Sequence, residues 1–241
     1  MRKSVKIAIF VPLGLLVGLL LIGFFLYQAT QQEPEFYTQA LEIEPEVAAE
    51  AGEILEEQVF ALSNQIKKPT RWQLSLTDAQ INGWLASDLE EKFPKFLPKE
   101  VEKPRVLITE DQILLACRFK GQQFQSVMTL SVDIFLVEEE ENVVAIRIHQ
   151  ATAGLLPVPL SQLLDQIAEH TDKAEVPVRW KQIENDPVAL LHVPSTGEGI
   201  NGRIRIDTIA LRDGEIYLAG ETVKAKSVSE TREEAEVAAA Q

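Results

Sequence analysis

Apolar and polar residues alternate with two different periods along this chain of 241 residues. From Val47 to Ile66 the apolar positions are three or four residues apart, which predicts an amphipathic helix that ends before Pro69. Thr77-Asp78-Ala79-Gln80 has the sequence of a capping box and predicts the start of a second helix. The apolar positions of this second helix include Trp84 and Phe93, and Pro94 ends it.

The following region changes to a period of two, which is typical of β-strands. Apolar residues alternate with polar ones over 113–119, 128–136 and 144–148, after a first strand over 106–109. This alternation predicts an antiparallel meander with one apolar face and one wetter face. Further strands are expected over 71–76, 176–183, 188–193, 203–211 and 215–221, with Asp213-Gly214 as the turn of a C-terminal hairpin. A short amphipathic helix is expected over 161–171.

These elements predict an α+β fold. One domain, residues 47–223, would contain a curved antiparallel β-sheet, made of the meander and the C-terminal hairpin, packed with two or three amphipathic helices. Residues 28–46 are rich in glutamate and predict an acidic linker. Residues 224–241 are charged, rich in alanine and without an apolar face, and predict a disordered tail.

An apolar run without any charge covers residues 7–27 and predicts a transmembrane helix. Arg2, Lys3 and Lys6 lie before it, in a basic end of residues 1–6 that should stay in the cytoplasm. We therefore expect a single-pass protein of the cell membrane, which contacts the bilayer through residues 7–27. The domain that follows would be extracytoplasmic.

Composition and motifs exclude several classes of function. The formal net charge of -14 disfavours nucleic acid as a partner, because phosphate binding needs a basic surface. Cys117 is the single cysteine, so an intrachain disulfide and a metal site built on thiolates are both excluded. His149, His170 and His192 have no spacing typical of metal ligands, and His192 is expected to lie in the core.

Two further patterns resemble sites, and each has a simpler explanation. The segment 197–202 matches G-x-G-x-x-G, but a strand-like segment follows it where a dinucleotide site needs a helix. Four consecutive glutamates, residues 138–141, are expected to form a solvated hairpin tip. No nucleophile motif is present, so we predict a protein that is not an enzyme and has no catalytic residue, cofactor or metal.

The order of elements resembles the YpmS-like family of bacterial single-pass membrane proteins. The N-terminal apolar run, the helix opening 76–82, the meander, and the junction Gly154-Leu155-Leu156-Pro157-Val158-Pro159 before a short helix carry the resemblance, over about residues 70–220. The longer acidic helix over 47–66 and the charged tail depart from it. The resemblance implies an architecture and a location, and no catalytic residues.

Two functions follow as hypotheses. In the first, a non-enzymatic envelope module binds a lipid or another apolar ligand in a groove between a helix and the sheet. The residues expected to line this groove are Trp84, Phe93, Met128, Leu130, Val132, Ile134, Val144 and Ile146. In the second, the helix–sheet interface is filled and the domain is a scaffold that binds an envelope protein partner. A large apolar cavity would favour the first, and a filled core with an exposed apolar patch would favour the second.

Overall fold

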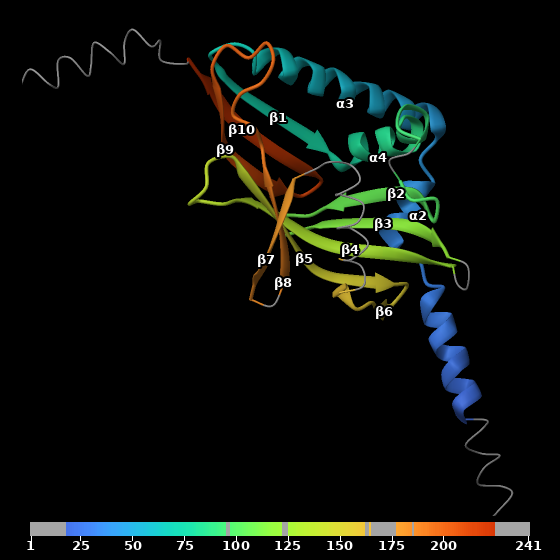
Figure 1. Ribbon diagram of the computed structural model, residues 1–241. Coiled ribbons are helices and arrows are strands. Elements are labelled where there is room, and N and C mark those ends of the chain that lie inside the picture. The colour runs from blue at the N-terminus through green and yellow to red at the C-terminus, as the bar shows by residue number, and fades with distance from the viewer. Residues whose placement is uncertain are drawn as a thin grey trace, which may run out of the picture.

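Two antiparallel β-sheets form the body of the protein (Figure 1). The computed structural model describes residues 18–94, 97–121, 125–161, 164, 177–184 and 186–224. The seven-stranded sheet has the order β2-β3-β4-β5-β8-β7, with β6 paired to β5. Its strands are β2 (Val101–Ile108), β3 (Ile113–Lys120), β4 (Gln125–Leu136), β5 (Val143–Ala153), β6 (Leu156–Pro157), β7 (Val178–Ile183) and β8 (Asp186–His192).

The three-stranded sheet has the order β1-β10-β9. It joins β1 (Arg71–Thr77) to the hairpin of β9 (Arg203–Arg212) and β10 (Glu215–Val223). The predicted α+β class with antiparallel strands is confirmed, as is the two-residue turn at Asp213-Gly214. The expectation of one sheet is wrong, because the C-terminal hairpin pairs with β1 and not with the meander.

Several helices lie beside these sheets, in addition to the helix over residues 18–30. They are α2 (Glu35–Leu41), α3 (Pro45–Gln65), α4 (Asp78–Ser87) and the short α5 (Leu89–Lys92). The capping box at the start of α4 is confirmed, since Thr77 Oγ1 accepts from the Gln80 amide and the Gln80 side chain accepts from the Thr77 amide. The helix α2 lies inside the range 28–46, where a linker was expected, and packs against β2.

The α4 helix lies against the outer edge of the seven-stranded sheet. The Asn82 side chain donates from Nδ2 to the Val106 carbonyl (2.8 Å) and accepts at Oδ1 from the Val106 amide (2.7 Å). Val106 belongs to β2, which is an edge strand. An unpaired edge strand exposes backbone groups that can pair with another chain. The buried amide of Asn82 satisfies two of these groups and fixes α4 to the sheet.

The predicted transmembrane helix over residues 7–27 is corrected by the structure. Among the described residues, no helix has both the length and the apolar character needed to cross a membrane. The described part of that range belongs to a helix over residues 18–30. On this finding the transmembrane anchor is wrong, as is the single-pass location with a cytoplasmic N-terminus and an extracytoplasmic domain.

Three predicted segments lie outside the described residues, wholly or in large part. They are the basic end with the first part of the apolar run (residues 1–17), most of the short helix expected over 161–171, and residues 225–241 of the charged tail.

Candidate functional site

The six strand residues predicted to line a groove share one face of the seven-stranded sheet. Met128, Leu130, Val132 and Ile134 alternate along β4, and Ile146 and Val144 of β5 lie opposite Ile134 and Leu136. The register of β3 adds Cys117 opposite Met128 and Leu115 opposite Leu130. Since alternate residues of a strand point to the same side, these side chains form one continuous surface, which we call the apolar face.

The apolar face is only half buried. Val132 is 4% exposed, whereas Met128, Leu130, Ile134, Val144 and Ile146 are partly exposed and Leu115 is 39% exposed. The two well-packed apolar clusters of the sheet lie on its opposite face. One cluster contains Val143, Ala145, Val188 and Leu190, and the other contains Tyr37, Ala116 and Val127. The apolar face also has buried side chains near its margins, since Val106 and Ile108 of β2 and Ile148 of β5 lie on the same side of the sheet.

The opposite face is polar only in its central part. Asp133 of β4 pairs in register with Arg147 of β5, and the Arg147 guanidinium also lies over the Phe135 ring, 5.3 Å from its centroid. His149 lies at a register shift of β5, with Nδ1 3.0 Å from Asp186 and Nε2 3.5 Å from Asp133. These groups pair with one another, and we assign them no site.

Trp84 and Phe93 form a separate pair on the helical side of the molecule. Their ring centroids are 5.8 Å apart, and Trp84 Nε1 donates to Glu56 of α3 (3.0 Å). Lys92 bonds the same Glu56 carboxylate, and these two hydrogen bonds lower its pKa, the one from Lys92 most. The helix α4 packs on α3, β1 and β2. The structure therefore joins the six strand residues into one surface and holds Trp84 and Phe93 together in another place.

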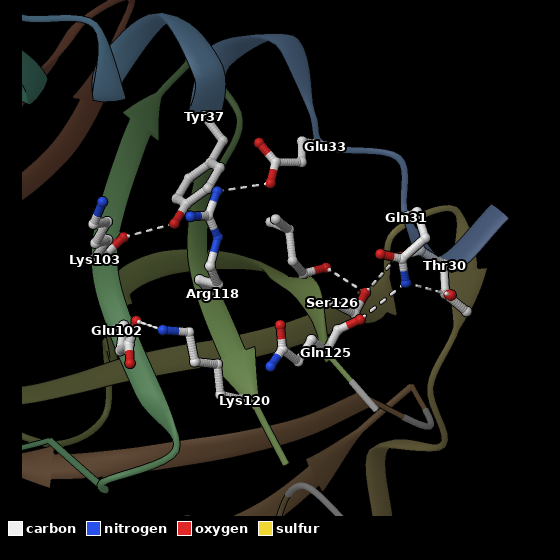
Figure 2. A network of polar contacts seen from close by, with 11 residues as sticks. Thr30, Gln31, Glu33, Tyr37, Glu102, Lys103, Arg118, Lys120, Gln125 and Ser126 are labelled. Carbon is white, nitrogen blue, oxygen red and sulfur yellow. Dashed lines mark hydrogen bonds and ion pairs between the residues drawn. The ribbon is translucent and has the colours of Figure 1, made fainter. Parts of the chain in front are cut away.

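Polar contacts fix one end of the apolar face to the chain before α2 (Figure 2). Ser126 Oγ donates to the Thr30 carbonyl (2.7 Å), and Gln31 Nε2 donates to the Gln125 carbonyl (3.0 Å). Arg118 pairs with Glu33 at 2.8 Å on the next strand. These contacts place the end of the helix over residues 18–30 beside the start of β4, next to Met128.

Tyr37 fixes α2 to the seven-stranded sheet (Figure 2). Its ring is fully buried between α2 and the sheet, and its hydroxyl donates to the Lys103 carbonyl (3.0 Å). Burial raises the pKa of Tyr37 to about 12. The sequence analysis did not single out Tyr37, because an aromatic residue in an acidic segment gave no periodic signal.

The cysteine, the histidines and the glycine motif considered in the sequence analysis form no reactive or ligand-binding site among the described residues. Burial raises the pKa of the Cys117 thiol to about 11, so this thiol is protonated at neutral pH and unreactive. His192 is exposed at the end of β8, so its expected place in the core is wrong, and His170 lies outside the described residues. The glycine motif at 197–202 leads into the strand β9 and not into a helix.

The glutamate run lies in the β4–β5 turn and forms ion pairs with residues of β7 and β9. Glu140 pairs with Arg179 at 2.5 Å, and Glu141 pairs with Arg203 at 3.3 Å. Hydrogen bonding to Arg179 lowers the pKa of Glu140. Within the part of the chain that the structure describes, no group of three or more His, Cys, Asp and Glu side chains is arranged to hold a metal ion.

Comparison with known proteins gives no independent guide to the site. Neither protein-family models, nor curated proteins, nor solved structures contain a match to this chain. The resemblance to the YpmS-like family therefore stays a prediction.

Proposed function

We propose that the protein binds a lipid-like apolar ligand along the apolar face of its seven-stranded sheet, and that it does so without catalysing a reaction. One observation carries the proposal: five of the six strand residues predicted to line a groove are partly exposed on one face of the sheet, namely Met128, Leu130, Ile134, Val144 and Ile146. A monomeric protein rarely exposes a continuous apolar patch unless something covers it in use.

The dimensions of the face suit an extended chain. From Met128 to Leu136, β4 extends by about 27 Å at about 3.4 Å per residue. Cross-strand partners on β3 and β5 widen this apolar strip on both sides. Covering ten methylene groups would contribute about 8 kcal/mol, before the cost of association is subtracted. The ligand would therefore be held in the micromolar range or more weakly, which suits reversible binding.

The test is uptake of dansyl-undecanoic acid, a fluorescent fatty acid, by the full chain. Leu130→Trp adds bulk in the middle of the apolar face and should abolish the rise in dansyl fluorescence with little change in the free energy of unfolding. Gln150→Trp is the matched control, because Gln150 lies exposed on the opposite face of the neighbouring strand. It should bind the probe as the parent chain does.

Two results would count against the proposal. If the parent chain takes up no probe, or if both tryptophan variants take it up equally, the apolar face is not the binding site. A destabilisation of about 1–3 kcal/mol by Leu130→Trp would indicate that the face is already filled and has been overpacked.

A second function rests on a different surface. The helix α3 exposes Val47, Ile54 and Phe60, and the helix over residues 18–30 exposes a run of large apolar side chains from Leu19 to Tyr27. Such side chains favour contact with a partner protein. Phe60→Glu should weaken binding to that partner while leaving uptake of the fatty acid unchanged, so the two functions are separable in one set of variants.

A further inference from the structure

A polar cleft lies on the three-stranded sheet, away from the apolar face. Its volume is about 750 Å³, and its lining comes from β1, β9, β10 and the end of α3. Ala219 forms one cross-strand row with Gln73 and Thr208, and Tyr217 of the next row points to the same side. The small side chain of Ala219 leaves a hollow between these longer neighbours.

The hollow is shaped by an irregularity in the strand pairing. The register of β9 and β10 shifts between Ala219 and Gly220, which leaves Asp207 without a partner across the ladder. Such a bulge bends the strand and increases its twist. A Cβ on Gly220 would lie 2.2 Å from the Arg205 carbonyl and 2.4 Å from the Trp72 ring, so only glycine fits there.

The lining consists mainly of uncharged groups that both donate and accept hydrogen bonds. Gln65, Gln73 and Thr208 supply amides and a hydroxyl, and the Tyr217 hydroxyl donates to Gln73 Oε1 (3.1 Å). Trp72 also borders the cleft, while its ring packs against Gly220 on the other side of the sheet from Gln73 and Ala219.

The charges at the cleft cancel. Arg71 and Asp207 are its two charged lining residues, and Asp207 Oδ1 already accepts from Arg205 Nε (2.8 Å). Arg205 continues to Glu221 at 2.7 Å, so the charged groups form a chain of ion pairs at the rim. A site of this kind has no excess charge to attract a phosphate or an ammonium group, and the overall charge of -14 repels anions further.

We propose that this cleft binds a neutral polyhydroxylated ligand, namely a saccharide. Amide, hydroxyl and paired carboxylate groups match the alternating donors and acceptors of vicinal sugar hydroxyls. The Tyr217 ring adds an aromatic surface, although the Arg212 guanidinium lies over it at 4.6 Å and covers one side. This site is independent of the apolar ligand proposed above, since the two surfaces are on different sheets.

The experiment is saturation-transfer difference NMR on the full chain, with maltotriose and the trimer of N-acetylglucosamine as probes and inorganic phosphate in a parallel titration followed by phosphorus NMR. At least one of the two saccharides should receive saturation from the protein, and phosphate should show no binding. Ala219→Leu fills the hollow and should abolish the transfer. Ala210→Leu places the same side chain on the same face, opposite Tyr217 and outside the cleft lining, and should retain it.

A second variant covers the case in which Ala219→Leu does not fold. Thr208→Val keeps the shape of an exposed residue and removes one hydroxyl, and it should weaken saccharide binding about fivefold. Absence of transfer to both saccharides overturns the proposal, and so does equal transfer in the parent chain and in a folded Ala219→Leu variant. Binding of phosphate in their place would show that the site recognises anions. Uptake of the fluorescent fatty acid should be unchanged in all these variants.

Discussion

Tyr37 shows how a single side chain can hold an element in place. Its ring fills the space between α2 and the sheet, and its hydroxyl is bonded to a backbone carbonyl at Lys103, whose φ of 49° is unusual for a residue with a side chain. We expect Tyr37→Phe to lower the free energy of unfolding by about 1 kcal/mol, because it leaves that carbonyl without its donor. Urea denaturation at pH 7 measures the difference. Tyr217→Phe, which removes a more exposed hydroxyl, should change it by less than about 0.5 kcal/mol.

The raised pKa of Tyr37 predicts that the protein loses stability at alkaline pH. The folded protein raises the pKa of Tyr37 from 10.0 to about 12, so its neutral form is favoured by folding. This contribution is complete below pH 10 and is lost as the pH rises from about 10 to about 12, because the unfolded chain ionises first. Cys117 acts in the same direction from pH 9 to about 11.

Urea denaturation across pH 8 to 12 tests this dependence. The loss of stability above pH 10 should be smaller in Tyr37→Phe than in the parent chain, and smaller again when Cys117→Ala is added. Identical pH profiles for the parent and the double variant would contradict the assignment.

At the level of single residues, sequence reasoning identified the positions whose neighbours in the chain reveal them. Thr77 and Gln80 are three residues apart, so the capping box was predicted and is confirmed. Asn82 and Tyr37 act on backbone groups of Val106 and Lys103, far along the chain. Nothing in the local pattern distinguishes such residues from ordinary polar or aromatic ones, since their partners exist only in the folded chain.

The helices α3 and α4 cross with their backbones almost in contact. A Cβ on Gly83 of α4 would lie 2.4 Å from the Ala48 carbonyl and 2.9 Å from the Gly52 amide of α3. In an isolated helix, replacing glycine with alanine is favourable by about 1 kcal/mol. Here the added methyl group would meet rigid backbone, and the steric cost should exceed that gain.

We therefore expect Gly83→Ala to destabilise the protein by about 1–3 kcal/mol. Gly52→Ala is the comparison within the same crossing, because a Cβ there would lie 3.0 Å from an Asp88 side-chain oxygen and 3.1 Å from both Ser87 Oγ and the Trp84 Cα, farther than the 2.4 Å at Gly83. It should cost less. Thermal denaturation of both variants decides the matter, and a Gly83→Ala variant as stable as the parent would mean that the helices can separate without penalty.

Most elements were predicted with the right type because their periods are strong. The strands over 113–119, 128–136 and 144–148 lie within β3, β4 and β5. The buried face of α3 was harder to predict. The apolar spacing from Val47 to Ile66 predicted the helix, yet Val47 and Ile54 are exposed, and Ala48 and Gly52 are buried. Two helices that cross at short distance need small residues at the contact. A search for hydrophobic periodicity instead marks large apolar residues as the buried ones, so it missed Ala48 and Gly52.

For the whole molecule, the division into two sheets depends on contacts between distant parts of the chain. The strand β1 pairs with β10, so Arg71 lies opposite Glu221. Hydrophobic periodicity gives the type of an element but carries no information about its partner. The six strand residues share one face because they lie on neighbouring strands of a meander, whereas Trp84 and Phe93 were grouped with them without any local evidence of contact.

Asn142 links the two sheets and provides a prediction for the molecule as a whole. It lies in the β4–β5 turn, is 3% exposed, and has a φ of 57°. Its Nδ2 donates to the Ile204 carbonyl (2.7 Å) and its Oδ1 accepts from the Ile206 amide (2.8 Å), both on the edge strand β9. Asparagine tolerates this left-handed conformation better than most residues with a side chain.

Replacing Asn142 should loosen the junction between the sheets without unfolding either one. Asn142→Gly keeps the backbone conformation and removes both hydrogen bonds, so we expect the free energy of unfolding to fall by about 2–4 kcal/mol, from two unsatisfied backbone groups. Asn142→Ala should cost about 1 kcal/mol more, because alanine is strained at positive φ.

Hydrogen exchange measures the loss at the junction itself. The Ile206 amide should lose protection in both variants, while the amides that pair β3 with β4 keep theirs. If the Ile206 amide stays protected in Asn142→Gly, another acceptor holds β9 and the two sheets are joined elsewhere.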